Sequence, residues 1–261
     1  MDQSSIKILC IGNSFSEDTT AYVAQIASSI GFSKVLVANL YVGGCPIAKH
    51  YENWREDLPC YRYDRNDGTG WQRTTDVKIS DAIREEEWDW ISIQHGSSYG
   101  ACYTDEACYA DLPALLREVK QLAGEKTKIA FNMAWVGEPT RDRPEMLLFD
   151  RDQKRYYEAL CAVTQRVVAP TAGLDLVCPT GTAVQNARTS NLNGQLDRDG
   201  FHLSLTHGRY LAGLTFLRAL TGADISHVTW MPEGVSEAQR QLMVRAALCA
   251  VEMPFEITPI E

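Results

Sequence analysis

The fold of this chain is decided by the stretch Ile6-Lys7-Ile8-Leu9-Cys10-Ile11-Gly12-Asn13-Ser14-Phe15-Ser16. A short apolar run that ends in glycine predicts a buried strand, and the small polar residues after it predict the turn into which that strand leads. In an open α/β sheet, chemistry gathers just beyond the carboxyl ends of the strands. Ser14 is therefore a candidate functional residue, and the rest of the chain must supply what a serine there would need.

Strand and helix patterns alternate along the remaining sequence. Four more apolar runs, at 35–40, 88–94, 128–133 and 174–178, predict further strands. Helical spacing of apolar residues predicts helices over 21–30, 77–87, 105–123, 151–168, 202–220 and 235–251. This alternation predicts a three-layer α/β/α fold around a five-stranded parallel sheet.

No internal repeat or low-complexity linker divides the sequence, so a single domain over 1–261 is expected. One segment departs from the alternating pattern. Aromatic and charged residues flank Asn66-Asp67-Gly68, a turn sequence that predicts a β-hairpin insertion near 58–75.

Composition excludes several classes of partner. The formal net charge is −9 and Lys and Arg form no cluster, which argues against binding to nucleic acid or to an anionic membrane surface. The apolar runs are far shorter than the roughly 20 residues of a membrane-spanning helix. The few residues before the first strand leave no room for a signal sequence, so a cytoplasmic location is expected unless a targeting segment was removed.

The eight cysteines form no C-x-x-C pair and no zinc-type spacing, and no metal or cofactor is expected. Cys10, Cys161, Cys178 and Cys249 lie in apolar surroundings and are expected to be buried thiols. Disulfides and the oligomeric state stay open at this point.

The strongest distant partner for Ser14 is Asp199-Gly200-Phe201-His202. An acid three residues before a histidine can orient the imidazole ring, which leaves the second ring nitrogen free to accept the proton of a serine hydroxyl. A serine is a poor nucleophile without such a base. Each piece alone also fits an ordinary turn serine or a helix-capping aspartate, so their combination carries the prediction.

These blocks resemble the SGNH (GDSL-like) hydrolase family. The first block is Gly12-Asn13-Ser14-Phe15-Ser16, a glycine pair after the second strand, Gly43-Gly44, matches the second, and the last is Asp199-Gly200-Phe201-His202. The resemblance implies a flavodoxin-like fold with Ser14 as nucleophile, His202 as base and Asp199 as the residue that orients it.

The third block departs from the family pattern. Where the family has Gly-x-Asn-Asp, with the Asn as an oxyanion donor, this chain has Gln94-His95-Gly96-Ser97. We assign the oxyanion hole to the backbone N–H groups of Ser14 and Gly44 and the side-chain amide of Gln94. The Asn-Ser first block together with this glutamine most resembles the family branch that includes carbohydrate acetyl esterases.

Several other residues are candidates with competing interpretations. Gly96-Ser97-Ser98-Tyr99-Gly100 fits G-x-S-x-G, which makes Ser98 an alternative nucleophile, although the next helix is predicted only from residue 105. His95, Tyr99 and Trp135 are candidates for substrate binding, and with the Trp71 hairpin the aromatic residues would form a wall for sugar rings. Each of these positions also fits ordinary packing. His207 follows His202 by five residues, a spacing that does not favour a metal pair.

The leading interpretation is a serine esterase that removes a small acyl group such as acetyl, with a small-molecule or glycan ester as its partner. A lipase or thioesterase of the same type stays open. A non-catalytic glycan-binding domain is a second alternative, and a phosphate or nucleotide binder at Gly12-Asn13-Ser14 is a third.

Overall fold

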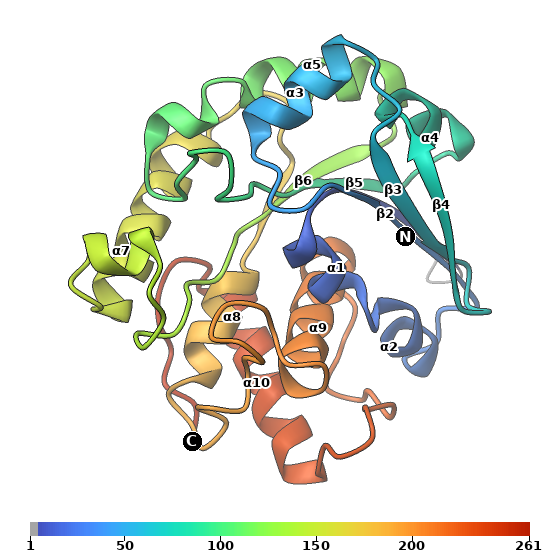
Figure 1. The fold of residues 1–261 in the computed structure, drawn as a ribbon. Coiled ribbons are helices and arrows are strands. Elements are labelled where there is room, and N and C mark those ends of the chain that lie inside the picture. The colour runs from blue at the N-terminus through green and yellow to red at the C-terminus, as the bar shows by residue number, and fades with distance from the viewer. Residues whose placement is uncertain (1–4) are drawn as a thin grey trace.

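The computed structural model describes residues 5–261. A seven-stranded sheet runs through the middle of the molecule (Figure 1). The strand order is β4-β3-β2-β1-β5-β6-β7. The strands are β1 (Ser5–Gly12), β2 (Lys34–Tyr41), β3 (Tyr61–Asn66), β4 (Trp71–Val77), β5 (Trp90–Ile93), β6 (Lys128–Asn132) and β7 (Leu176–Cys178).

Five of the strands, β2-β1-β5-β6-β7, are parallel, and they correspond to the five strands predicted from the sequence. Numbered by their sequence order, these strands lie as 2-1-3-4-5, an order typical of doubly wound α/β folds. The predicted fold class is confirmed. In this order the chain leaves β1 at the point where the strand order reverses, which is where such folds bind their ligands.

The predicted hairpin is present as β3 and β4, which pair with each other in antiparallel fashion. β3 also pairs with β2, so the hairpin extends the sheet instead of lying on its surface. The sheet therefore has seven strands where five were predicted. An antiparallel neighbour needs only backbone hydrogen bonds along an open edge, which the apolar pattern of the core does not reveal.

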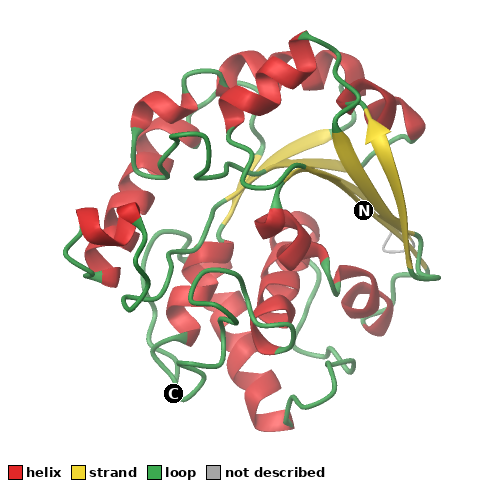
Figure 2. Cartoon of the chain, viewed as in Figure 1, coloured by secondary structure: helices red, strands yellow, loops and turns green. Residues whose placement is uncertain are grey.

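Helices cover both faces of the sheet (Figure 2). Buried residues of α3, α4 and α5 form one core cluster, and those of α1, α2, α8, α9 and α10 belong to the other. The α-helices are α1 (Ser14–Thr20), α2 (Val23–Ser29), α3 (Ile47–Arg55), α4 (Ile79–Glu85), α5 (Leu112–Ala123), α6 (Pro144–Leu148), α7 (Gln153–Val163), α8 (Thr180–Ala187), α9 (His207–Thr221) and α10 (Glu237–Glu252). A 3₁₀ turn (Glu106–Tyr109) precedes α5 and a π-helical turn (Thr164–Val168) follows α7.

The central strand β1 contributes to both core clusters. Ile8 and Cys10 face one helical layer, whereas Leu9 and Ile11 face the other. A strand buried on both faces needs apolar side chains at successive positions, which explains its nearly continuous apolar sequence. This burial fixes the direction in which the chain leaves the strand after Gly12.

Three helices begin at positions other than those predicted. The first was predicted from residue 21, but α1 begins at Ser14 because Asn13 caps it, and a short break separates it from α2. The helix predicted over 105–123 is a 3₁₀ turn followed by α5, which begins at Leu112. The helix predicted from residue 202 begins at His207, because residues 199–203 form a hydrogen-bonded loop instead.

No helix among residues 5–261 is long and apolar enough to span a lipid bilayer. All eight cysteines are free thiols. Cys10, Cys161 and Cys178 are buried as predicted, whereas Cys249 is partly exposed. Within the same residues, no group of three or more His, Cys, Asp or Glu side chains is arranged to hold a metal ion.

Candidate active site

Ser14 is the first residue of α1, directly beyond the carboxyl end of β1. The preceding residue, Asn13, forms a capping box: the Phe15 N–H donates to Asn13 Oδ1 at 2.9 Å, and the Asn13 N–H donates to Ser16 Oγ at 3.0 Å. The Asn13 side chain also donates to the carbonyl of Cys45 at 3.3 Å. These bonds hold the turn on both sides of Ser14, so its backbone is fixed before any ligand binds.

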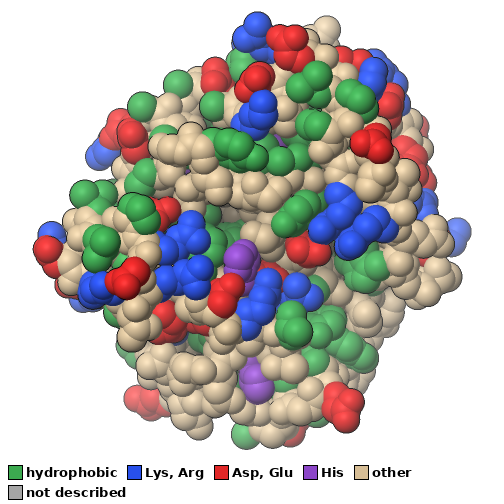
Figure 3. All heavy atoms as spheres, viewed as in Figure 1, with side chains coloured by type: hydrophobic (Ala, Val, Ile, Leu, Met, Phe, Trp, Pro, Cys, Tyr) green, Lys and Arg blue, Asp and Glu red, His purple; other side chains and the backbone are tan. Residues whose placement is uncertain are grey.

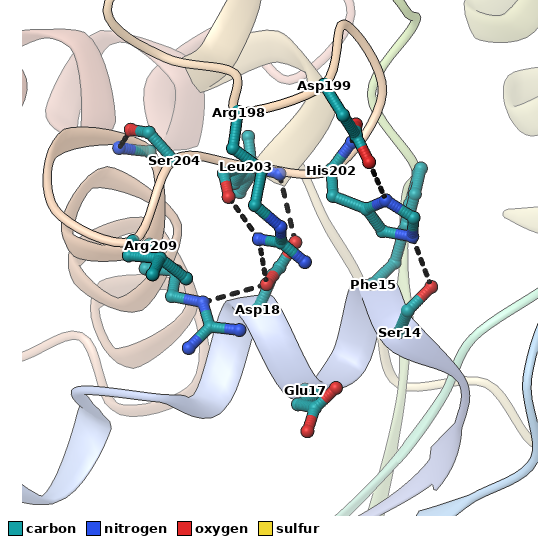
Figure 4. A network of polar contacts seen from close by, with 12 residues as sticks. Ser14, Phe15, Glu17, Asp18, Arg198, Asp199, His202, Leu203, Ser204 and Arg209 are labelled. Atoms are coloured by element: carbon teal, nitrogen blue, oxygen red, sulfur yellow. Dashed lines mark hydrogen bonds and ion pairs between the residues drawn. The ribbon is translucent and has the colours of Figure 1, made fainter.

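Ser14, His202 and Asp199 form a continuous chain of hydrogen bonds (Figure 4). His202 Nε2 lies 3.0 Å from Ser14 Oγ, and His202 Nδ1 lies 2.7 Å from Asp199 Oδ2. A carboxylate can only accept, so it selects the ring tautomer with the proton on Nδ1. Nε2 is then free to accept the serine proton, which is the arrangement of a nucleophile, a base and an orienting acid.

The Asp199 carboxylate is positioned by its own loop. Its Oδ1 accepts the backbone N–H groups of Phe201 at 3.0 Å and His202 at 2.7 Å, and Gly200 between them adopts a positive φ of 73°. Desolvation raises the pKa of this carboxyl, but the hydrogen bonds from the His202 ring and from the backbone outweigh it and lower the pKa to about 2. Asp199 is therefore ionised at every ordinary assay pH.

A buried carboxylate connects the serine helix to the histidine loop (Figure 4). Asp18, on α1, has no solvent-exposed side-chain surface. Its Oδ2 accepts the Leu203 N–H at 2.9 Å, and its Oδ1 accepts from Arg198 at 2.9 Å and from Arg209 at 2.8 Å. Since Leu203 directly follows His202, these contacts set the distance between the His202 imidazole and Ser14.

Replacing Asp18 by asparagine is expected to lower kcat about tenfold with little change in KM, because small shifts of a catalytic group are costly in rate. The free energy of unfolding should fall by about 2 to 3 kcal/mol, since two arginines lose a charged partner. Ester hydrolysis and urea unfolding measure the two effects.

The matched control for this change is Asp150→Asn, which removes an exposed carboxylate that pairs with Arg155 at 3.2 Å. It should alter neither quantity, since exposed ion pairs contribute little. If Asp18→Asn loses stability but keeps the wild-type kcat, Asp18 supports only the fold.

Gly44 lies in the loop that the Asn13 side chain contacts. Its φ is 60°, and a Cβ added there would lie 2.0 Å from Ser98 Oγ. Its carbonyl accepts the Ser98 N–H at 3.2 Å. Both the backbone conformation and the close approach of Ser98 require glycine at this position.

Changing Gly44 to alanine is expected to reduce kcat/KM about 100-fold, because the loop must move and one N–H donor to the oxyanion is displaced. Steady-state hydrolysis of a small ester measures this loss. Gly43→Ala is the matched control, since a Cβ there meets only the Tyr41 hydroxyl at an ordinary 3.7 Å. Equal losses in both variants would remove Gly44 from the oxyanion hole.

Gln94 does not fit the oxyanion role predicted for it. Its side chain is only 1% exposed, Nε2 donates to the Asn132 carbonyl at 2.9 Å, and Oε1 accepts from Asn132 Nδ2 at 2.9 Å. Thr180 in turn donates to Asn132 Oδ1. The amide belongs to a buried network between β5, β6 and α8, where bonding within the core takes precedence over contact with a ligand.

Two of the predicted substrate-binding residues are also buried. His95 packs against Tyr109 and accepts the Ile47 N–H at 3.2 Å, and desolvation lowers its pKa to about 4. Trp135 stacks on Phe15 with ring centroids 3.9 Å apart. Neither side chain can form the sugar-binding wall proposed from the sequence. Trp135 instead supports the histidine loop, because its Nε1 donates to the Phe201 carbonyl at 2.7 Å.

The remaining candidates lie on a turn. Tyr99 is exposed and has a φ of 59°, and Gly100 has a φ of 79°, so no helix starts at Ser98. Among the described residues Ser98 has no hydrogen bond to a histidine, and no nucleophile elbow is present. His202 and His207 belong to no group of three or more potential metal ligands within residues 5–261, and His207 Nδ1 pairs with Thr206 Oγ1 at 3.1 Å.

Comparison with known proteins identifies the family. Residues 7–250 match the family model described as a domain of unknown function, DUF4886. The chain belongs to this family. A DUF4886 family protein from Bacteroides uniformis has a similar crystal structure, with a TM-score of 0.91 and 30% identity over 97% of each chain. A comparison with curated proteins finds no match.

More distant structures share the fold of this DUF4886 chain. A candidate SGNH hydrolase from Slackia heliotrinireducens has a TM-score of 0.52 at 18% identity, covering 83% of this chain and 99% of its own. The acetylxylan esterase Axe2 from Geobacillus stearothermophilus has a TM-score of 0.51 at 18% identity, covering 85% and 97%. The resemblance to SGNH hydrolases is thus confirmed at the level of the fold.

Sequence reasoning missed Asp18, Arg198 and Arg209. In the sequence Asp18 stands in the polar run Ser16-Glu17-Asp18-Thr19-Thr20, and a partner 185 residues away leaves no periodic signal. An acid that follows a nucleophile by one helical turn would have been the only hint. In this DUF4886 protein, α1 contributes both Ser14 and the carboxylate that binds the backbone next to His202.

The surface around the site is hollowed and strongly charged. Figure 3 shows a depression near the middle of this face, with a histidine at its edge and Lys and Arg side chains on both sides. Arg143 lies 3.8 Å from the centroid of the Phe201 ring, and Arg141 lies 5.7 Å from it. The His202 side chain is 26% exposed, so a substrate can reach it.

Proposed function

We propose that this chain is a serine esterase that hydrolyses a small acyl ester, most simply acetyl, on a carbohydrate through an acyl-enzyme on Ser14. The observation that carries the proposal is the hydrogen-bonded chain from Asp199 through His202 to Ser14, at 2.7 and 3.0 Å. A buried structural serine would not need a base with an oriented ring beside it.

In the first step, Ser14 Oγ attacks the acyl carbon while its proton passes to His202 Nε2. The backbone N–H groups of Ser14 and Gly44 stabilise the oxyanion that forms. His202 then gives the proton to the leaving sugar hydroxyl, and the acyl group stays on Ser14. A water molecule repeats the sequence in the second half, releasing acetate and free Ser14.

We choose a small acyl group because aromatic side chains pack closely beside Ser14. Phe15 contacts Trp135 at 3.9 Å and Phe201 at 4.8 Å between ring centroids, so aromatic side chains fill the space on that side of Ser14. The esterase from Geobacillus stearothermophilus is described as acting on acetylxylan, which supports a carbohydrate ester as substrate class.

The test combines turnover and labelling. Purified protein should hydrolyse p-nitrophenyl acetate much faster than p-nitrophenyl octanoate, and a fluorophosphonate should label Ser14, mapped by mass spectrometry. A preference for octanoate would indicate a lipase. Absence of both turnover and labelling would favour a binding-only domain or a phosphate binder. The phosphate alternative has less support, because Asn13 already accepts the Phe15 N–H at the helix start.

A further inference from the structure

Two cavities lie one after the other between the β3–β4 hairpin and helices α1 and α2, outside the candidate triad. The first has about 190 Å³, and the residues that line it are Glu17, Thr20, Ala21, Asn39, Asp64, Trp71, Arg73 and Arg209. The second has about 730 Å³, and the residues that line it are Ala24, Gln25, Ser28, Ser29, Asn66, Gly68, Thr69, Gly70, Thr229 and Trp230. We call the two cavities together the hairpin groove.

The β3–β4 hairpin and the α1–α2 segment line both cavities. On the helical side, α1 and the residue after it contribute positions 17, 20 and 21 to the first cavity, and α2 contributes positions 24, 25, 28 and 29 to the second. On the strand side, the pair Asp64 and Arg73 lines the first cavity. The next pair on the same face of the hairpin, Asn66 and Trp71, contributes one residue to each cavity.

One end of the hairpin groove lies close to the candidate triad. Glu17 follows Ser14 by one helical turn and accepts from Arg62 at 2.7 Å. The Arg62 guanidinium covers the ring of Tyr41 at 3.8 Å, where β2 ends just before the Gly43-Gly44 loop. A chain bound in the groove would therefore reach the nucleophile at its near end.

The walls of the second cavity fit an uncharged, hydroxyl-rich ligand. Among residues 5–261, those that line it are Ser, Thr, Asn, Gln, Ala, Gly and Trp, without a charged side chain. This is unusual in a chain of which 23% is charged. Trp71, which is 42% exposed, lies in the first cavity, and Trp230 lies in the second. An indole offers an apolar face to the C–H side of a sugar ring.

Two buried acceptor atoms along the hairpin groove have no hydrogen-bond partner among residues 5–261. Asn39 is 1% exposed and lines the first cavity; its Nδ2 donates to Thr20 Oγ1 at 2.6 Å, but its Oδ1 has no donor. Gln25 Oε1, which also has no donor, lies in the second. A buried acceptor without a donor is costly, and a ligand hydroxyl would satisfy each of them.

The length of the hairpin groove fits a chain rather than a single sugar. Residues of both α1 and α2, from Glu17 to Ser29, line the groove, and the second cavity alone has about 730 Å³, room for more than one pyranose ring. The first cavity carries two acids and two arginines, whose charges balance, and the second carries no charge. From the uncharged wall of the second cavity, the tryptophans and the unpartnered acceptors, we infer that the groove binds the backbone of a neutral oligosaccharide. This inference rests on the proposed function, because it assigns the ester at Ser14 to a sugar at the end of that chain.

The test compares substrates of different length in variants of the hairpin groove. The ratio of kcat/KM for acetylated xylotetraose to that for acetylated xylose should fall about tenfold in Trp71→Ala. Ser28→Trp, which fills the second cavity from an exposed position, should lower the same ratio. Met253→Ala is the matched control, since Met253 is exposed to 44% and lies outside the groove.

Titration calorimetry with unacetylated xylotetraose tests binding without catalysis. Wild-type protein should bind xylotetraose more tightly than a galacturonate tetramer, and Trp71→Ala should weaken this binding. An equal ratio in Trp71→Ala, Ser28→Trp and Met253→Ala, or equal binding of the charged tetramer, overturns the inference. Binding of xylotetraose without hydrolysis of p-nitrophenyl acetate would instead keep the hairpin groove and overturn the proposed esterase.

Discussion

Replacing Ser14 by alanine is expected to lower kcat for p-nitrophenyl acetate by about 10⁴- to 10⁶-fold, with KM nearly unchanged. The variant loses the only oxygen within hydrogen-bond distance of His202 Nε2 in the candidate triad. The residual rate would come from the oxyanion donors and from substrate binding alone. Steady-state hydrolysis with active-site titration measures the loss and excludes traces of wild-type enzyme.

Ser98→Ala is the matched control for this change, since Ser98 belongs to the G-x-S-x-G sequence. It should keep kcat within about twofold, because a turn serine has no part in acyl transfer. Fluorophosphonate should label this variant at Ser14 and should not label Ser14→Ala. If activity disappears with Ser98 and persists without Ser14, the chain is still an esterase, but its nucleophile has been assigned wrongly.

Asp199→Asn is expected to lower kcat by about 10³- to 10⁴-fold while the fold is retained. An asparagine can turn its amide nitrogen toward the ring and favour the tautomer that carries its proton on Nε2, which cannot accept from Ser14. The carboxylate is also lost as the partner of the imidazolium that forms during the reaction. Hydrolysis rates and a thermal unfolding curve of the same sample measure both properties.

The lowered pKa of Asp199 limits the pH range in which this carboxyl can affect the rate. The pKa of Asp199 falls from 3.8 to about 2 on folding, so the stability that its ionised form contributes is present above 3.8 and is lost only as pH falls toward 2. Activity that declines at mildly acidic pH therefore reports protonation of another group. If the wild-type rate stayed constant down to pH 4 and fell only below it, Asp199 would be the group that titrates.

The parallel sheet could be predicted from the sequence because its strands are buried on both faces. The apolar runs around Ile8 and Ile91 have no other explanation in a chain of this length. The hairpin could be located in the sequence, but its pairing with the sheet could not be predicted, since all but one residue of β4 are exposed. Helix starts were less predictable, because Asn13 and Ser16 compete with several equally good capping residues nearby.

The candidate triad was predictable because its residues lie in short local patterns, whereas its surroundings were not. Gln94 has the right chemistry for an oxyanion donor, and only the three-dimensional position of Asn132 shows that its amide is already bonded. Trp135 likewise has the residue type of a sugar platform but fills the core against Phe15. Residue type predicts what a side chain can do, and burial decides whether it is available.

The Asp18 carboxylate has a consequence for how the protein is made. His202 follows its hydrogen-bond partner Ser14 by 188 residues, and the contact from Asp18 to Leu203 closes a similarly long loop. Contacts of such sequence separation form late in folding. On the proposed function, a chain that ends before His202 carries a serine without its base, and the onset of esterase activity during refolding would time the docking of residues 199–203 against α1.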